Sequence, residues 1–149
     1  MSPLTVFLLL SVVSHVASDT LFVFSGQVTC RLNRQFSYRI VVIEEDWPYD
    51  QVLKAGGIAY FQTSPSFYNI TTSDSTDGWT SEYELRFQVH HDCNSNGDKY
   101  HLNVRYNVGD YAITHGTHYI TYNMDLTNQG DYWPSALKFS SGEGESVNE

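Results

Sequence analysis

The chain has 149 residues, the length of one domain, and a formal net charge of −9 from 17 acidic and 8 basic residues. A nucleic-acid-binding protein normally carries a basic stripe, and this sequence has none, so we exclude nucleic acid as a partner. The acidic balance also disfavours anionic membrane surfaces, which would need a local basic patch or a bridging cation.

The N-terminal segment has the composition of a secretion signal. Residues 1–18 contain no Lys, Arg, Asp or Glu, and Leu4 to Val13 form a short apolar run. This run is too short to span a bilayer but suits a signal peptide, and Val16-Ala17-Ser18 offers small residues for cleavage. We therefore predict a signal peptide over 1–18, a single domain over 19–139 and secretion to the extracellular space; the alternative is a buried N-terminal strand.

Alternation of apolar and polar residues then predicts strands rather than helices. The inward face of the first strand carries Phe22, Phe24, Val28, Cys30 and Leu32. Gly26 interrupts that face and predicts a bulge or close packing. A second strand is predicted over 36–45, and Pro48 enforces a turn after it because proline cannot donate to a strand ladder.

The middle of the chain predicts a short strand over 58–62 and another over 67–71, with Tyr68 and Ile70 inward. The clearest alternation follows. Its inward side carries Tyr83, Leu85, Phe87, Val89, His91 and Cys93, and its outward side carries Glu84, Arg86, Gln88, His90 and Asp92. The pair Asn96-Gly97 is typical of a hairpin turn.

The strand after this turn mirrors the one before it. Its inward side carries Tyr100, Leu102, Val104 and Tyr106, and its outward side carries His101, Asn103, Arg105 and Asn107. A last strand is predicted over 119–126, and residues 140–149, rich in Gly, Ser and Glu, are expected to form a disordered acidic tail. Many short strands separated by turns predict an all-β sandwich of about seven strands.

The two cysteines predict one disulfide. Cys30 and Cys93 both lie on inward faces, and export would expose them to an oxidising compartment. A bridge over this separation would contribute about 4 kcal/mol to stability. Two buried free thiols are the alternative.

Three segments resemble the nematode transthyretin-like family: Gly26-Gln27-Val28-Thr29-Cys30, His91-Asp92-Cys93-Asn94, and Val108 to Ile113 followed by Tyr122 to Leu126. The resemblance covers most of residues 22–127. It implies a secreted transthyretin-like, immunoglobulin-like β-sandwich with an extracellular binding or bridging role at cell surfaces. The sequence departs from the family at 62–66, where many relatives have a short Asp/Gly-containing hairpin, and in having only two cysteines.

Histidines are weak candidates for a metal site. His90 and His91 are adjacent in a strand, so they point to opposite faces and cannot chelate one ion together. His115 and His118 could converge in a loop, but a zinc site needs three or four ligands. We predict no metal and no cofactor; for His91 we expect a hydrogen-bonded, partly buried side chain.

A calcium loop is a second weak candidate. Asp92, Asn94 and Asn96, followed by Gly97, match the first positions of the EF-hand pattern, but the twelfth position is Asn103 instead of Glu. The same residues are equally suited to a hairpin turn. The loop from Asp74 to Asp77 has serines in several ligand positions and is weaker still.

Catalytic motifs are missing from the sequence. There is no Gly-x-Ser-x-Gly elbow, and no Tyr-Arg-Gly-Ser ending like that of the hydroxyisourate hydrolases, which share the transthyretin architecture. We therefore expect a protein that is not an enzyme, with such a hydrolase as the least favoured alternative.

Two further features concern the surface. Asn69-Ile70-Thr71 is a glycosylation sequon, and with Ile70 inward Asn69 should face solvent; the alternative is an unmodified asparagine. The cluster Tyr132-Trp133-Pro134 either offers exposed aromatics for protein contact or packs over a sheet edge.

The sequence as a whole predicts a secreted binding protein. Its partner would be an extracellular protein or a cell-surface molecule. A carrier of a small apolar or lipid ligand is the alternative, and the oligomeric state stays open.

Overall fold

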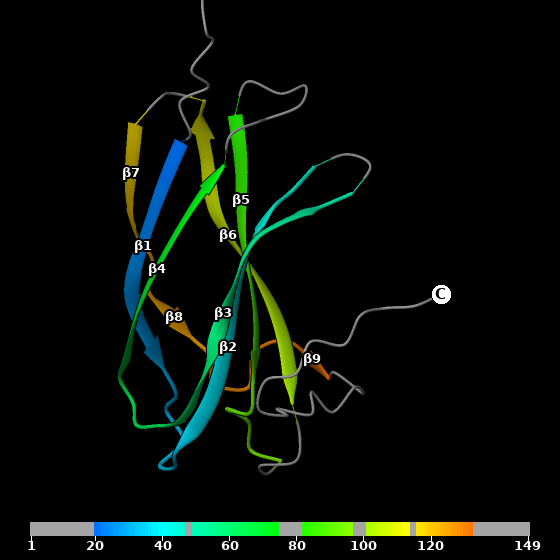
Figure 1. Cartoon of the computed structure of the whole chain (residues 1–149). Helices are drawn as coiled ribbons and strands as arrows, with labels where there is room; N and C mark the ends of the chain where they lie inside the picture. Colours follow the sequence, from blue (N-terminus) through cyan, green and yellow to red (C-terminus); the bar gives the residue numbers. More distant parts are fainter. Residues whose placement is uncertain (1–19, 47–48, 75–81, 97–100, 114–115, 133–149) are drawn as a thin grey trace, which may run out of the picture.

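The computed structural model describes residues 20–46, 49–74, 82–96, 101–113 and 116–132, and these residues form two β-sheets packed face to face (Figure 1). The predicted signal peptide over 1–18 and the predicted tail over 140–149 lie outside the described residues. None of the described residues forms a helix long and apolar enough to cross a membrane.

One sheet is antiparallel throughout. Its strands, in spatial order, are β3 (Gln51–Gln62), β2 (Phe36–Glu44), β5 (Glu82–His91), β6 (Leu102–Ala112) and β9 (Asp131–Tyr132). The predicted inward side of β5 is confirmed, because every second side chain from Tyr83 to His91, and Cys93 after the strand, is buried. In β6, Leu102 is buried, and Val104 and Tyr106 pack against the core. His90, predicted to face outward, is also buried.

The other sheet mixes parallel and antiparallel pairing. Its strands are β4 (Ser66–Asp74), β1 (Thr20–Thr29) and β7 (Gly116–Thr121), with β8 (Met124–Asp125) also paired to β1. β1 runs antiparallel to β4 but parallel to β7 and β8. The sandwich class is confirmed, and the described residues contain nine strands where about seven were predicted.

The predicted strand over 119–126 is divided into β7 and β8. Both pieces keep the same register against β1. At the break, the Asn123 side chain replaces the backbone as partner, because its Oδ1 accepts a hydrogen bond from the Gln27 amide at 2.9 Å. The predicted strand is therefore interrupted only where a side-chain oxygen takes the place of a backbone acceptor.

β3 begins seven residues before the predicted strand over 58–62. The register of β3 against β2 shifts between Ala55 and Ile58, so that Gly56 and Gly57 together lie opposite Ile40. This is a β-bulge, which glycine accommodates readily, and the strand continues through it. β6 likewise continues past Asn107 to Ala112, with a second register shift opposite Leu85 and Arg86.

The core lies between the two sheets. Aromatic rings of β1 meet those of β5: Phe22 and Tyr83 are edge to face with centroids 5.1 Å apart, and Phe24 and Phe87 are similarly arranged at 5.2 Å. Burying a large apolar side chain contributes about 1.5–3 kcal/mol, and each such aromatic pair adds about 0.5–1.5 kcal/mol. The predicted inward faces therefore hold the sandwich together.

A disulfide also joins the two sheets. Cys30 follows β1 and Cys93 follows β5, and both are buried with their Cα atoms 5.9 Å apart. This confirms the predicted Cys30–Cys93 bridge.

Candidate functional site: a cleft between two sheet edges

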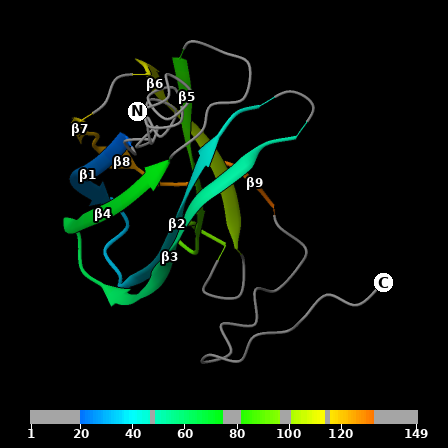
Figure 2. The same ribbon diagram turned by 45° about the horizontal axis from the view of Figure 1, so that its top comes forward.

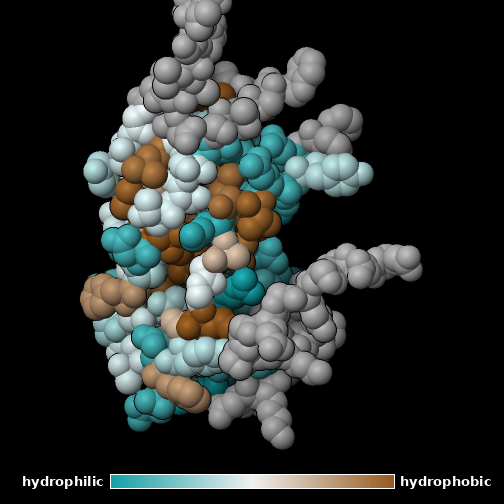
Figure 3. Space-filling view, viewed as in Figure 1, coloured by the Kyte–Doolittle hydropathy of each residue, from teal (hydrophilic) through white to brown (hydrophobic). Residues whose placement is uncertain are grey.

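The sandwich has an open side where β3 ends the five-stranded sheet and β4 ends the four-stranded sheet (Figures 1 and 2). A cleft of about 510 Å³, called here the β3–β4 cleft, lies between them. Tyr38 and Ile40 of β2 line it, together with residues 54–57 and Ala59 of β3 and residues 67–71 of β4. Apolar surface gathers in the middle of this face (Figure 3).

Both strands that border the cleft are edge strands. In the described part of the chain, β3 pairs with β2 alone and β4 pairs with β1 alone. Each therefore has one edge whose backbone N–H and C=O groups are not used in a ladder. Such an edge is a ready template for another extended chain.

Polar contacts join β3 to β4 at both ends of the cleft. At one end the Thr72 hydroxyl donates to the Leu53 carbonyl at 3.0 Å. At the other, the Tyr38 hydroxyl lies 3.0 Å from the Ser66 hydroxyl, which donates to the Gln62 side-chain oxygen at 3.0 Å. Between these contacts the two strands diverge, so the fold itself sets the length and width of the opening.

The two glycines of the bulge have different surroundings. A Cβ on Gly56 would lie 2.7 Å from the Ile40 carbonyl oxygen, so no larger residue fits there. The Gly56 carbonyl accepts a hydrogen bond from Arg39 Nε at 3.1 Å. A Cβ on Gly57 would meet no atom within 4 Å. Gly57 is therefore a point on the cleft wall where a side chain can be added without displacing the fold.

Tyr68 connects the cleft to the far end of the four-stranded sheet. Its hydroxyl donates to the Tyr122 carbonyl at 2.6 Å, and its ring passes over Gly26, as the predicted close packing at that glycine requires. Burial raises the pKa of the Tyr68 hydroxyl well above its ordinary value, with smaller contributions from Tyr122 and Tyr38. The hydroxyl therefore remains protonated and keeps its role as donor.

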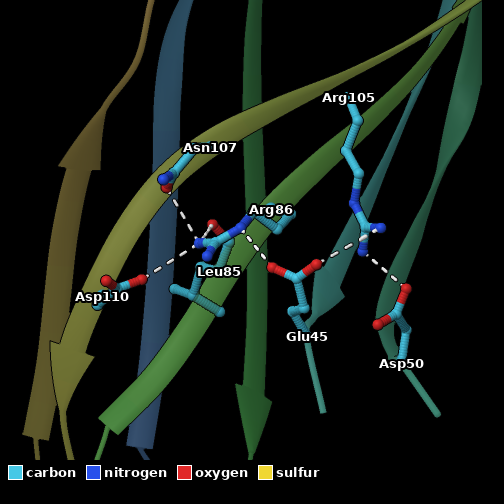
Figure 4. Close-up of polar contacts among 7 residues, drawn as sticks. All are labelled: Glu45, Asp50, Leu85, Arg86, Arg105, Asn107 and Asp110. Atoms are coloured by element: carbon cyan, nitrogen blue, oxygen red, sulfur yellow. Dashed lines mark hydrogen bonds and ion pairs between the residues drawn. The ribbon is translucent and has the colours of Figure 1, made fainter. Parts of the chain in front are cut away.

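The outer face of the five-stranded sheet carries an ion-pair network instead of a cleft. Figure 4 shows Arg86 between Glu45 and Asp110, and Arg105 between Glu45 and Asp50. Arg86 Nε donates to Glu45 at 2.9 Å, and Arg105 donates to Asp50 at 2.7 Å. The outward direction of both arginines was predicted, but the network was not, because Glu45 and Asp50 come from the β2–β3 connection and Asp110 from the far end of β6.

The network has a structural interpretation. Negative and positive side chains alternate through the network, in the order Asp110, Arg86, Glu45, Arg105 and Asp50. Their ion pairs hold the β2–β3 connection against β5 and β6. All five charges already have a partner of opposite sign, which leaves little attraction for a charged ligand.

The histidines of the described ranges do not form a group of metal ligands. His91 is fully buried, and its Nε2 lies 3.0 Å from the Gln129 carbonyl. Burial lowers the pKa of His91 to about 4, against a smaller opposing effect of the Gln129 hydrogen bond, so the ring is neutral near pH 7. His118 stacks on Phe22 with centroids 5.4 Å apart, and His115 lies outside the described residues.

The residues of the calcium candidate hold one another in a turn. Asp92 Oδ1 accepts the Ser37 amide at 2.7 Å and lies 3.8 Å from Arg34, while Asn94 Oδ1 accepts the Asn96 amide at 2.7 Å. A nearby guanidinium is unfavourable for a bound cation. Within the described ranges, no three His, Cys, Asp or Glu side chains are grouped as metal ligands. Asp77 lies outside those ranges.

Two other surface predictions fall partly within the described residues. Asn69 is exposed on β4, as the alternation predicted, with Tyr68 and Ile70 turned towards the core. Tyr132 belongs to β9, which pairs with the first residues of β6 and so covers that part of the sheet edge, although the Tyr132 ring is half exposed. Trp133 and Pro134 lie outside the described residues.

The cleft itself was not predicted from the sequence. Assigning the third strand to 58–62 left out Lys54, Gly56 and Gly57, which form one of its walls. The signal was present, since two glycines within an otherwise apolar and β-branched run are typical of a bulge.

Comparison with known proteins places most of this domain in one family. A family model described as Caenorhabditis elegans protein of unknown function (DUF870) matches residues 25–134. The comparison with curated proteins and the comparison with solved structures found no match. The matched range runs from the middle of β1 to just past β9 and includes every residue of the β3–β4 cleft. The chain therefore belongs to the DUF870 family of Caenorhabditis elegans proteins.

Proposed function

We propose that the protein is a secreted, non-catalytic binding protein whose β3–β4 cleft receives an extended segment of an extracellular or cell-surface partner protein. The observation that carries the proposal is the pair of edge strands on either side of an apolar-floored cleft. An extended segment placed there would hydrogen-bond to a strand edge, and its alternate side chains would enter the cleft.

The chemistry of the lining defines the segment. Lys54 is the single charged residue among those that line the cleft, and Ile40 and Ile70 supply apolar surface. A basic side chain placed in the cleft would lose hydration and be repelled by Lys54, whereas an acidic side chain would gain an opposite charge. The favoured segment therefore carries small or apolar side chains and no basic residue within the cleft.

Two features support an extracellular location. The apolar run over 4–13 fits a signal peptide, and a disulfide that joins the two sheets is typical of exported domains. We also propose that the protein is transthyretin-like. The sequence segments around the two cysteines and the disulfide-linked sandwich support that affiliation.

The test adds a side chain to the cleft wall. The full chain is expressed in eukaryotic cells with its own N-terminus, and partners in secretions and on intact cells are cross-linked and quantified. Gly57→Trp should reduce capture of a saturable partner at least tenfold, because the indole would occupy the cleft. The matched control is Thr117→Trp on β7, which is exposed on the opposite edge of the sandwich and should bind as the wild type does.

Amide hydrogen exchange then locates the bound segment. Addition of a strand should slow exchange in β3 or β4 and leave β7 unchanged. Equal partner capture by Gly57→Trp and the wild type, with both proteins folded by circular dichroism, would contradict the proposal. Protection confined to β7 would contradict it as well.

The volume of the cleft favours a second candidate function. About 510 Å³ lies within the range of small-molecule sites, so a carrier of an apolar or lipid ligand is the alternative. Native mass spectrometry of protein purified from secretions would show a retained small molecule that is lost in Gly57→Trp.

A further inference from the structure

The glycosylation sequon lies on a strand between two exposed side chains. Phe67, Asn69 and Thr71 occupy alternate positions of β4 and all three are exposed, with the Phe67 side chain 69% accessible to solvent. Phe67 makes no ring contact with any other described residue. A phenylalanine exposed to this extent, two positions from a sequon asparagine, calls for an explanation.

Among the described residues, the outward positions of β4, β1 and β7 carry no charge. These positions are Phe67, Asn69, Thr71 and Ser73 on β4, Leu21, Val23, Ser25 and Gln27 on β1, and Thr117, Tyr119 and Thr121 on β7. β8 of the same sheet does carry a charge, Asp125, which pairs with Arg31 at 2.6 Å. The outer face of the other sheet, in contrast, carries the ion-pair network. A neutral, hydroxyl-rich face with aromatic rings suits a carbohydrate, which is neutral and amphipathic.

We propose that Asn69 carries an N-linked glycan whose first sugar ring lies on the Phe67 ring. The Asn69 side-chain nitrogen would displace the pyrophosphate of a lipid-linked oligosaccharide donor at the sugar C1. A C–N bond forms, the C1–O bond to the pyrophosphate breaks, and one proton leaves the nitrogen. Because this reaction occurs in the secretory pathway, the inference depends on the proposed export of the protein.

The strand geometry fits the contact. Alternate residues of a strand are about 6.5 Å apart on one face, and this separation is within the reach of an asparagine side chain and one attached sugar. The C–H groups of a pyranose carry partial positive charge, and the face of a phenyl ring is negative. Seating the sugar on the ring would cover apolar surface that the bare protein leaves in water. β4 is an edge strand and residues 67–71 line the β3–β4 cleft, so the remaining sugars would lie on the β4 side of the cleft and leave the edge of β3 to an incoming segment.

The experiment compares thermal stability with and without the sugar. The full chain is secreted from cells that make high-mannose glycans, and the glycan is either kept, trimmed to a single N-acetylglucosamine or absent through Asn69→Gln. The intact and trimmed forms should melt about 2–6 °C above Asn69→Gln. In a Phe67→Ser background, this difference should disappear.

A control variant and the distribution of the protein distinguish the outcomes. Tyr119→Ser removes a comparably exposed ring from β7, two strands from Asn69, and should leave the difference in melting temperature intact. Exported protein with Asn69 unmodified would overturn this inference alone. A chain retained in the cytosol and unglycosylated would overturn the inference together with the proposed function. A melting difference that survives Phe67→Ser would show that the sugar does not rest on that ring.

Discussion

At the scale of single residues, Gly26 has the least room for a side chain among the described glycines. It lies in β1 where the Tyr68 ring crosses towards the Tyr122 carbonyl, and a Cβ there would overlap that carbonyl oxygen. Neither neighbour can move freely, because Tyr122 also donates its amide to the Ser25 carbonyl at 2.9 Å. The packing of three strand segments therefore depends on the absence of one side chain.

Gly26→Ala should lower the free energy of unfolding by about 3 kcal/mol or more, because the methyl group forces β1 and the residues after β7 apart. Gly57→Ala is the matched control, since its Cβ meets nothing within 4 Å, and it should change stability by less than about 0.5 kcal/mol. Urea unfolding followed by circular dichroism measures both. Equal midpoints for the two variants would contradict the close packing at Gly26.

His91 predicts a loss of stability in acid. The pKa of His91 is lowered to about 4 in the folded protein, from an ordinary value of 6.5, because the ring is buried. Between these values the unfolded chain binds more protons, so the contribution of this ring is fully present above pH 6.5 and is lost as the pH falls towards 4. The expected loss is about 3 kcal/mol. Burial, aided by Arg39, also lowers the pKa of His90, which acts in the same direction.

The measurement is urea unfolding at several pH values between 7 and 4. His91→Gln cannot titrate, so its stability should fall less steeply over this interval than that of the wild type. If the stability of the wild type and that of the variant fall equally steeply with pH, His91 is not the group that causes the loss of stability in acid.

At the scale of elements, the ion-pair network explains how the β2–β3 connection is held. Glu45 at the end of β2 and Asp50 before β3 are tied to β5 and β6 by Arg86 and Arg105. The two arginines are not equivalent, since the side chain of Arg86 is 14% exposed and that of Arg105 is 42% exposed. Arg86 also donates to the Leu85 carbonyl at 3.0 Å.

Arg86→Gln should therefore cost about 1–3 kcal/mol, because Asp110 loses its cation and Glu45 keeps only its 3.7 Å contact with Arg105. Arg105→Gln should cost less than about 1 kcal/mol, since exposed pairs contribute little. Chemical unfolding in low salt measures both. A larger effect of Arg105→Gln would mean that the exposed half of the network holds the connection.

Much of this element-level arrangement follows from the sequence, and the exceptions have physical causes. Alternation placed Phe22, Phe24 and the inward side of β5 correctly, because burying one face of a strand requires a period of two. The first half of β3 was not predicted, because the pair Gly56 and Gly57 resembles a turn in the sequence. The pairing with β2 identifies the two glycines as a bulge within one strand. The cleft and the Arg86 network join residues distant in sequence, and no local pattern encodes such proximity.

At the scale of the whole molecule, the Cys30–Cys93 bridge fastens one sheet to the other. It closes a loop of 63 residues, which restricts the unfolded chain strongly. The double variant Cys30→Ala, Cys93→Ala should lose about 4 kcal/mol of unfolding free energy. Urea unfolding with and without a reductant measures this loss; the reductant should destabilise the wild type and leave the double variant unchanged. If the reductant leaves the unfolding free energy of the wild type unchanged, the bridge does not have this structural role.

The parallel pairing of β1 with β7 and β8 has a consequence for how the protein is made. β1 needs partners that lie 96 residues later in the chain, as in the contact between Gln27 and Asn123. At ribosomal speeds of about 5–20 residues per second, those partners emerge roughly 5–20 s after β1 does. Throughout that interval the backbone groups on one edge of β1 have no partner strand, so the nascent chain has its greatest need of a chaperone before β7 and β8 have been synthesised.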